Sequence, residues 1–78
     1  MLWSRKLIKP IELKDGRVLD RLIEARNLYV ELPERSRNSP HWQNAAGAIM
    51  AAATSQDTGD VAYATARLLL AVRAEGLR

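Results

Sequence analysis

The chain has 78 residues, no cysteine, one histidine and a formal net charge of +3. This length allows a single domain, 1–78, because each half of a divided chain would lack a sufficient hydrophobic core. The absence of cysteine excludes disulfides and thiolate metal sites, and one histidine cannot build a histidine-rich metal site. We therefore expect one small domain without a metal or other cofactor, in which residues 1–6 can form a flexible tail.

The sequence shows no targeting or membrane-spanning signal. Basic residues at Arg5, Lys6 and Lys9 interrupt the beginning of the chain, so no apolar signal-peptide core follows. The segment Ala45–Ala53 is apolar, but it is too short and too rich in alanine and glycine to span a bilayer. Together with the absence of cysteine, this pattern predicts a cytoplasmic protein without a membrane partner.

The first predicted element is a β-hairpin. Asp15 and Gly16 form a strong two-residue turn signal, because glycine accepts the positive φ that a primed turn needs. Ile11 and Leu13 alternate with a polar residue, which predicts one apolar and one solvated strand face. Pro10 has no backbone N–H, so we expect it at a strand start or at an edge.

The first of three predicted helices follows the hairpin directly. Asp20 can cap it, or the helix begins a residue or two later. Pro33 ends the helix near Leu32, and the segment 34–38 is predicted to be a polar loop. The apolar stripe of this helix consists of Leu22, Ala25, Leu28, Tyr29 and Leu32.

Two further helices have clear local boundaries. Ser39 can cap the second helix, and Pro40 suits its first helical position. Asp57 or Thr58 can cap the third helix, and Gly76 suits its C-terminal end. The second helix contains a nearly continuous run of small residues, which predicts that another helix packs closely against it.

These elements predict an α+β fold that is mostly α, with the hairpin packed on the helices as two layers. The expected strands are at about 8–14 and 17–20, and the expected helices at about 21–32, 40–54 and 58–75. Trp42 is interpreted either as a core anchor or as an exposed interface residue. The predicted core is Ile11, Leu13, Val18, Leu22, Ala25, Leu28, Tyr29, Leu32, Trp42, Ala46, Ile49, Ala53, Val61, Leu68, Leu69 and Val72.

Several short motifs occur in an order that suggests a family. They are Lys9-Pro10-Ile11, Asp15-Gly16-Arg17, Ala25, Leu32-Pro33, Trp42 with Ala45-Ala46, and Glu75-Gly76-Leu77. Over about Lys9 to Leu77 the chain resembles a family of short bacterial proteins of unknown function, in which an N-terminal hairpin precedes three helices. The resemblance implies the same fold, and it brings no catalytic residue with it.

The side chains capable of catalysis or metal binding lack the partners that these functions need. His41 has only Ser39 and Gln43 as polar neighbours in the sequence, which favours a surface or capping role. Asp57 and Asp60 have the spacing of a helix start and not that of a cation-binding loop. We therefore expect no enzyme, with no catalytic, cofactor-binding or metal-binding residue and no small-molecule substrate.

The third predicted helix has more apolar surface than one stripe can bury. Leu68, Leu69 and Leu70 point in directions about 100° apart. We predict a small protein-interaction module that self-associates, with a homodimer or another protein as its partner. The expected interface residues are Leu70, Leu2 and Trp3. In the alternative reading, Leu70 packs under Leu2 or Trp3 and the chain remains a monomer.

The positive charge is concentrated in residues 1–21, which contain six basic and three acidic side chains, whereas the rest of the chain is neutral. This pattern favours, as an alternative, a nucleic-acid-binding accessory protein. Base reading by the third helix is disfavoured, because Arg67 is its one suitable side chain between Val61 and Val72. The expected nucleic-acid contacts are Arg5, Lys6, Lys9, Lys14, Arg17 and Arg21.

Overall fold

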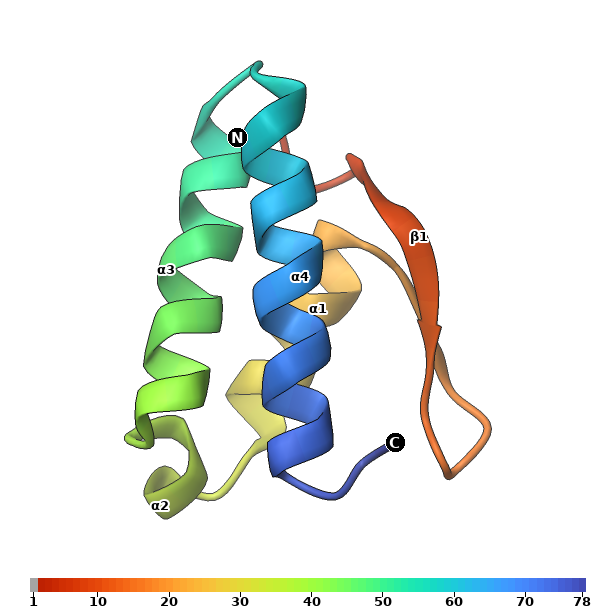
Figure 1. Ribbon diagram of the computed structural model, residues 1–78, viewed down its shortest axis with the longest axis vertical. Coiled ribbons are helices and arrows are strands. Elements are labelled where there is room, and N and C mark those ends of the chain that lie inside the picture. Colours follow the sequence, from red (N-terminus) through yellow and green to blue (C-terminus); the bar gives the residue numbers. More distant parts are fainter. Residues whose placement is uncertain (1) are drawn as a thin grey trace.

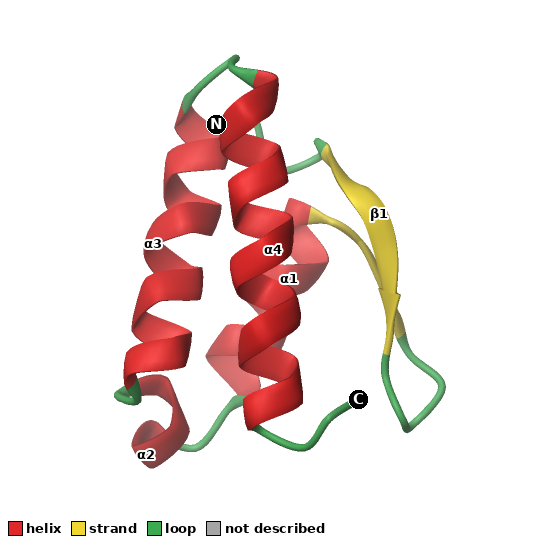
Figure 2. Ribbon diagram, in the orientation of Figure 1, coloured by secondary structure: helices red, strands yellow, loops and turns green. Residues whose placement is uncertain are grey.

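The computed structural model describes residues 2–78 and contains a β-hairpin followed by four helices (Figure 1). The elements are β1 (Lys6–Glu12), β2 (Val18–Arg21), α1 (Leu22–Glu31), α2 (Glu34–Arg37), α3 (Pro40–Thr54) and α4 (Thr58–Ala74). The predicted α+β, mostly α class is confirmed. The helices α3 and α4 lie side by side, and the hairpin flanks α4 on the other side (Figure 2).

The helix α2 corrects the sequence-based prediction of a polar loop at 34–38. Pro33 precedes this single turn, and its carbonyl accepts a hydrogen bond from the Arg37 N–H at 3.0 Å. The Ser36 hydroxyl donates to the Glu75 carboxylate at 2.7 Å and so fixes α2 to the end of α4. The loop prediction was wrong because a tertiary contact stabilises a turn that has no buried residue and therefore no apolar pattern.

The two strands pair antiparallel, but their register shifts inside β1. Lys6 lies opposite Arg21 and Ile11 lies opposite Leu19, so β1 contains more residues than β2 between these pairs. Such a bulge leaves some backbone groups of the longer strand outside the ladder. Pro10 lies in this irregular part, where a residue without a backbone N–H costs no ladder hydrogen bond.

The irregular part of β1 is attached to α4 by a buried threonine. The Thr65 hydroxyl accepts a hydrogen bond from the Ile8 N–H at 3.1 Å and donates to the Val61 carbonyl at 2.8 Å. At the other end of the hairpin, the Lys14 N–H donates to the Leu77 carbonyl at 2.8 Å. The hairpin is therefore held by α4 and by the C-terminal segment, in addition to its own ladder.

Trp42 is a core residue, which decides between the two interpretations of the sequence. Its side chain is 1% exposed, and its indole Nε1–H donates to the Glu75 carboxylate at 3.2 Å. Most of the predicted core is buried, although Tyr29, Ala46 and Leu69 are only half-buried. Buried residues outside the predicted list are Leu7, Leu19, Ala45, Ala48, Ala52, Ala64, Thr65 and Ala71.

The placement of Val18 in the core was wrong. Val18 is 44% exposed, and the neighbouring Leu19 is buried instead. Successive side chains of a strand point to opposite faces. An error of one residue in the predicted register therefore assigns the buried residues to the exposed face and the exposed residues to the buried face. Val18 lies opposite Glu12, which is also exposed, and this pair marks the solvated face of the hairpin.

The helix starts follow local capping, largely as the sequence predicts. Arg21 is the N-cap of α1, which is the later of the two starts left open by the sequence. The Glu24 carboxylate accepts hydrogen bonds from the Asp20 and Arg21 N–H groups, both at 2.9 Å. The Asp57 side chain caps α4 by accepting from the Gly59 N–H at 2.8 Å.

Candidate interaction surfaces

The exposed side of α4 carries an apolar stripe. Tyr63 and Leu70 are 55% and 47% exposed, and the small Ala66 is exposed between them. Spacings of three and four residues place these side chains on one side of a helix. Figure 1 shows α4 at the front of the molecule, between α3 and β1. Large apolar side chains thus lie where α4 is not covered by another element.

Charged groups lie at both ends of this stripe. Asp60 is in the first turn of α4 and Arg73 in its last turn. The Arg67 guanidinium lies 5.3 Å from the centroid of the Tyr63 ring, and its Nε–H donates to the Tyr63 hydroxyl at 3.1 Å. We call the surface formed by Asp60, Tyr63, Ala66, Leu70 and Arg73 the α4 face. It has large apolar side chains in the middle, which Arg67 borders beside Tyr63, and opposite charges at its two ends.

The three expected interface residues do not form one surface. The Leu2 N–H donates to the Ala53 carbonyl at 2.6 Å, and the Trp3 carbonyl accepts from the Ile23 N–H at 2.9 Å. Residues 2 and 3 are therefore held on α3 and α1, whereas Leu70 belongs to the α4 face. Leu70 is 47% exposed, so packing under the N-terminal residues does not bury it. Met1, the first residue of the expected flexible tail, lies outside the described residues.

A second apolar surface lies between α1 and α3, and the sequence-based interpretation missed it. Val30 and Met50 are 55% and 47% exposed and flank a hollow of about 180 Å³. The guanidinium of Arg26 lies 5.5 Å from the centroid of the half-buried Trp3 ring. We call this hollow the Trp3 groove, and its lining residues are Trp3, Arg26, Tyr29, Val30, Ala46, Ile49 and Met50. Val30 and Met50 are apolar residues that lie outside the apolar stripes of their helices. This pattern was the sequence signal from which an exposed apolar surface could have been predicted.

Two of the arginines expected to contact nucleic acid donate hydrogen bonds to backbone carbonyls of this chain. The Arg5 guanidinium donates to the carbonyls of Ala52 and Ser55, where α3 ends. A cation at a helix C-terminus is favoured, because the carbonyls there lack helical partners. The Arg21 guanidinium donates to the Ser4 carbonyl at 2.7 Å. Both arginines therefore hold the N-terminal segment in place.

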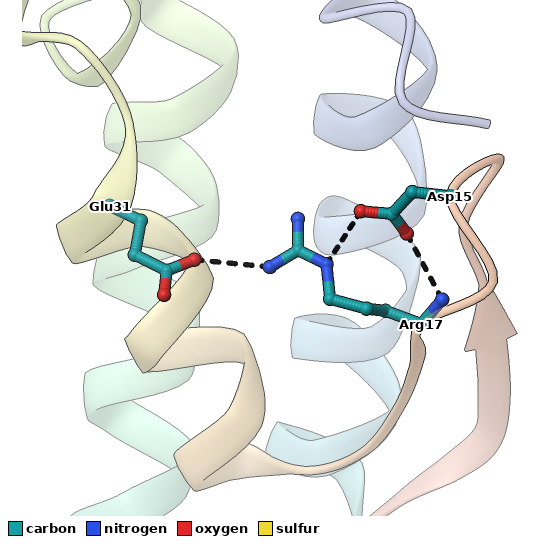
Figure 3. A network of polar contacts seen from close by, with 3 residues as sticks. All are labelled: Asp15, Arg17 and Glu31. Carbon is teal, nitrogen blue, oxygen red and sulfur yellow. Dashed lines mark hydrogen bonds and ion pairs between the residues drawn. The ribbon is translucent and has the colours of Figure 1, made fainter.

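Arg17 connects the hairpin turn to α1 (Figure 3). Its Nε–H donates to the Asp15 carboxylate at 2.7 Å, and its Nη1–H donates to the Glu31 carboxylate at 3.0 Å. The Arg17 backbone N–H is the main cause that lowers the pKa of Asp15 below 3.8, with the guanidinium as a further cause. The hydrogen bonds that the Arg17 guanidinium donates to the carboxylates of Asp15 and Glu31 raise the pKa of Arg17. All three side chains are exposed, so this network is a surface connection between two elements.

The remaining expected nucleic-acid contacts are lysines on the hairpin. Lys6, Lys9 and Lys14 are exposed, and none forms an ion pair within residues 2–78. Lys9 also borders a shallow hollow of about 250 Å³ between β1 and α4, beside Ile8 and Leu69. The hairpin thus carries three exposed lysines without an ion-pair partner among the described residues, and Lys9 lies next to α4.

No metal-binding cluster is found among the described side chains: residues 2–78 bring no three histidine or acidic groups together. His41 is exposed in the first turn of α3, and the hydroxyl of Ser39 accepts a hydrogen bond from the Trp42 N–H at 3.4 Å.

Within residues 2–78, every helix is too short or too polar to cross a membrane.

Comparison with known proteins adds no functional assignment. No family model, no curated protein and no solved structure matches the chain. The resemblance to short bacterial proteins with a hairpin and three helices therefore stays a prediction, carried by its turn and apolar motifs.

Proposed function

We propose that this chain is a non-enzymatic protein-interaction module that self-associates through the α4 face. The observation that carries the proposal is the pair of large apolar side chains, Tyr63 and Leu70, exposed on one side of α4. Burying such side chains against a partner removes apolar surface from water at about 25 cal/mol per Å². The cysteine-free composition supports a cytoplasmic location for this module.

An antiparallel second copy fits the α4 face best. A two-fold axis near Ala66 brings Tyr63 of one copy toward Leu70 of the other, and the small Ala66 allows the helices to approach closely. The same arrangement brings Asp60 toward Arg73 of the second copy. The two helix dipoles then also run in opposite directions.

Pairing of two hairpins into a continuous sheet is less favourable than pairing of α4 faces. The Ile8 N–H already donates to Thr65, and the Lys14 N–H already donates to Leu77. Lys9 also lies on β1, and exposed lysines disfavour edge-to-edge pairing between copies.

The test is sedimentation at several protein concentrations, with the variant Leu70→Lys beside the unaltered chain. We expect the unaltered chain to dimerise at micromolar concentration and Leu70→Lys to raise the dissociation constant at least about tenfold. Met50→Lys is the matched control, because Met50 is also 47% exposed but lies in the Trp3 groove. A monomer that persists to high micromolar concentration, or equal effects of both variants, contradicts the proposal.

A charge exchange tests the antiparallel arrangement. Asp60→Lys and Arg73→Glu each place like charges across the proposed two-fold axis, so each variant alone is expected to dimerise weakly. A mixture of the two restores unlike pairs and should form a heterodimer more tightly than either variant binds itself. Equal affinities in all three combinations would rule out this arrangement.

Nucleic-acid binding is a second candidate, supported by the three free lysines of the hairpin. Binding to a fluorescent single-stranded or double-stranded DNA should then weaken steeply with added salt. Lys9→Glu should weaken DNA binding at any given salt concentration. It should also lower the slope of the affinity against salt concentration by the amount expected for about one phosphate contact. Binding that is absent at low salt excludes this candidate.

A further inference from the structure

We infer that the Trp3 groove is a second docking site, which binds an acidic segment of a partner protein that inserts one large apolar side chain. The groove shares no residue with the α4 face, so this inference goes beyond the proposed self-association. The groove is lined by residues that are far apart in the sequence. Trp3 precedes the hairpin, whereas Val30 belongs to α1 and Met50 to α3.

The size of the groove indicates a side chain and not a free metabolite. Its volume of about 180 Å³ is below the roughly 300–1,000 Å³ of typical small-molecule pockets. A single bulky apolar side chain fills a space of this size, as anchor residues do at the centre of protein interfaces. Met50 can adapt its shape to such an anchor, because its side chain is unbranched and flexible.

The chemistry of the lining favours a protein partner. Trp3, Tyr29, Met50 and Arg26 surround the hollow, and these four residue types are enriched at protein interfaces. Val30 and Met50 are already half-exposed, so binding removes their apolar surface from water without a rearrangement of the core.

The charge of the partner follows from Arg26. It is the one charged side chain in the described lining, and it forms no ion pair within residues 2–78. Its guanidinium stacks on Trp3 at the edge of the hollow, which leaves its N–H groups available to an acceptor. A carboxylate beside the inserted side chain can bind there through charge-assisted hydrogen bonds. The geometry therefore matches an anchor side chain with glutamate or aspartate next to it.

The test uses a short acetylated peptide with one phenylalanine flanked by glutamates, titrated into the isotope-labelled full chain. We expect chemical-shift changes at the Trp3 indole N–H and the Met50 methyl group. A peptide with lysines in place of the glutamates, and one with alanine in place of the phenylalanine, should each bind at least about tenfold more weakly. The variant Arg26→Glu should reverse the preference, so that the lysine peptide binds more tightly than the glutamate peptide.

The controls separate this site from the α4 face. Met50→Lys should abolish the shift change at the Trp3 indole N–H and leave sedimentation unaltered, whereas Leu70→Lys should leave peptide binding unaltered. Absence of shift changes at Trp3 and Met50 with millimolar glutamate peptide would overturn the inference. It would also be overturned by an unchanged charge preference in Arg26→Glu, or by loss of self-association in Met50→Lys, which would assign the groove to a second copy.

Discussion

Trp42 and Glu75 join three helices through two hydrogen bonds. The Glu75 carboxylate accepts one hydrogen bond from the Trp42 indole and another from the Ser36 hydroxyl. Glu75 is also the C-cap of α4, where a negative charge is unfavourable to the helix dipole. The two hydrogen bonds offset that cost and connect α2, α3 and α4 at one end of the molecule.

Trp42→Ala is expected to lower the free energy of unfolding by about 3–5 kcal/mol, because it empties a fully buried site. Chemical unfolding followed by circular dichroism measures this change. Trp42→Phe keeps most of the volume, so it should fold even where the alanine variant does not. As control, Met50→Ala at an exposed site should change stability by less than about 0.5 kcal/mol. Equal effects of the two alanine variants would contradict the role of Trp42 as an anchor.

The hairpin turn is expected to show an acid-sensitive carboxylate at Asp15. Its pKa in the folded chain is lowered mainly by the Arg17 backbone N–H, so its stabilising contribution is present above pH 3.8 and is lost as the pH falls through the folded-state pKa. Carboxyl chemical shifts followed against pH measure this pKa. Arg17→Ala should raise the pKa only in part, because the backbone N–H remains. A full return to 3.8 would show that the guanidinium is the main cause.

Among the elements, β1 depends most on a contact outside its own sheet. Two-stranded sheets are marginal by themselves, and the bulge weakens the ladder between β1 and β2 further. Thr65 compensates by binding the Ile8 N–H from α4. Arg5 acts in a comparable way just before β1, since it connects the N-terminal segment to the end of α3. The hairpin is therefore stabilised from the helical side as well as by its own ladder.

Thr65→Val keeps the shape of the side chain but leaves the Ile8 N–H without its acceptor, which costs about 1–3 kcal/mol. We expect a lower melting temperature and faster hydrogen exchange at the amides of β1, with less change in α3. Thr54→Val is the matched control, because the exposed Thr54 hydroxyl bonds only to carbonyls of its own helix. Unchanged exchange at Ile8 in Thr65→Val would show that this hydrogen bond contributes little.

At the scale of the whole molecule, a small core limits the stability of the folded state. A chain of 78 residues buries only about 60–65% of the surface that it exposes when unfolded. Its two exposed apolar surfaces, the α4 face and the Trp3 groove, leave further apolar area in water. The proposed self-association would cover the α4 face and so add stability that the protomer lacks.

The melting temperature of the unaltered chain is therefore expected to rise with protein concentration, because dimerisation stabilises only the folded state. Leu70→Lys should remove this concentration dependence and keep the melting temperature of the dilute protein. Differential scanning calorimetry over a hundredfold concentration range is the measurement. A melting temperature that is independent of concentration in the unaltered chain would argue against self-association.

The sequence by itself determined the starts of α3 and α4 and the position of the hairpin turn, because these depend on neighbouring residues. Ser39 and Pro40 place the start of α3, and Asp57 caps α4 as one of the two predicted options. Gly16 and Gly76 adopt positive φ values of 93° and 78°, a backbone conformation that favours glycine at the turn and at the helix end. The turn type differs from the predicted primed turn, because Asp15 has no positive φ and the Leu13 N–H donates to the Arg17 carbonyl around a three-residue loop. Capping and turn formation act over a few residues, so they can be recognised without knowledge of the fold.

Only the tertiary structure decided which side chains are buried, which are exposed and which bind to distant parts of the chain. The exposure of Val18 depends on the register of β2 against β1, and β1 in turn is attached to α4. The helix α2 depends on the contact between Ser36 and Glu75. The sequence alone also did not show that Arg5 caps α3, or that Trp3 and Leu70 lie on separate surfaces. Each of these outcomes rests on contacts between distant parts of the chain, whose pairing is fixed by packing and not by local residue preference.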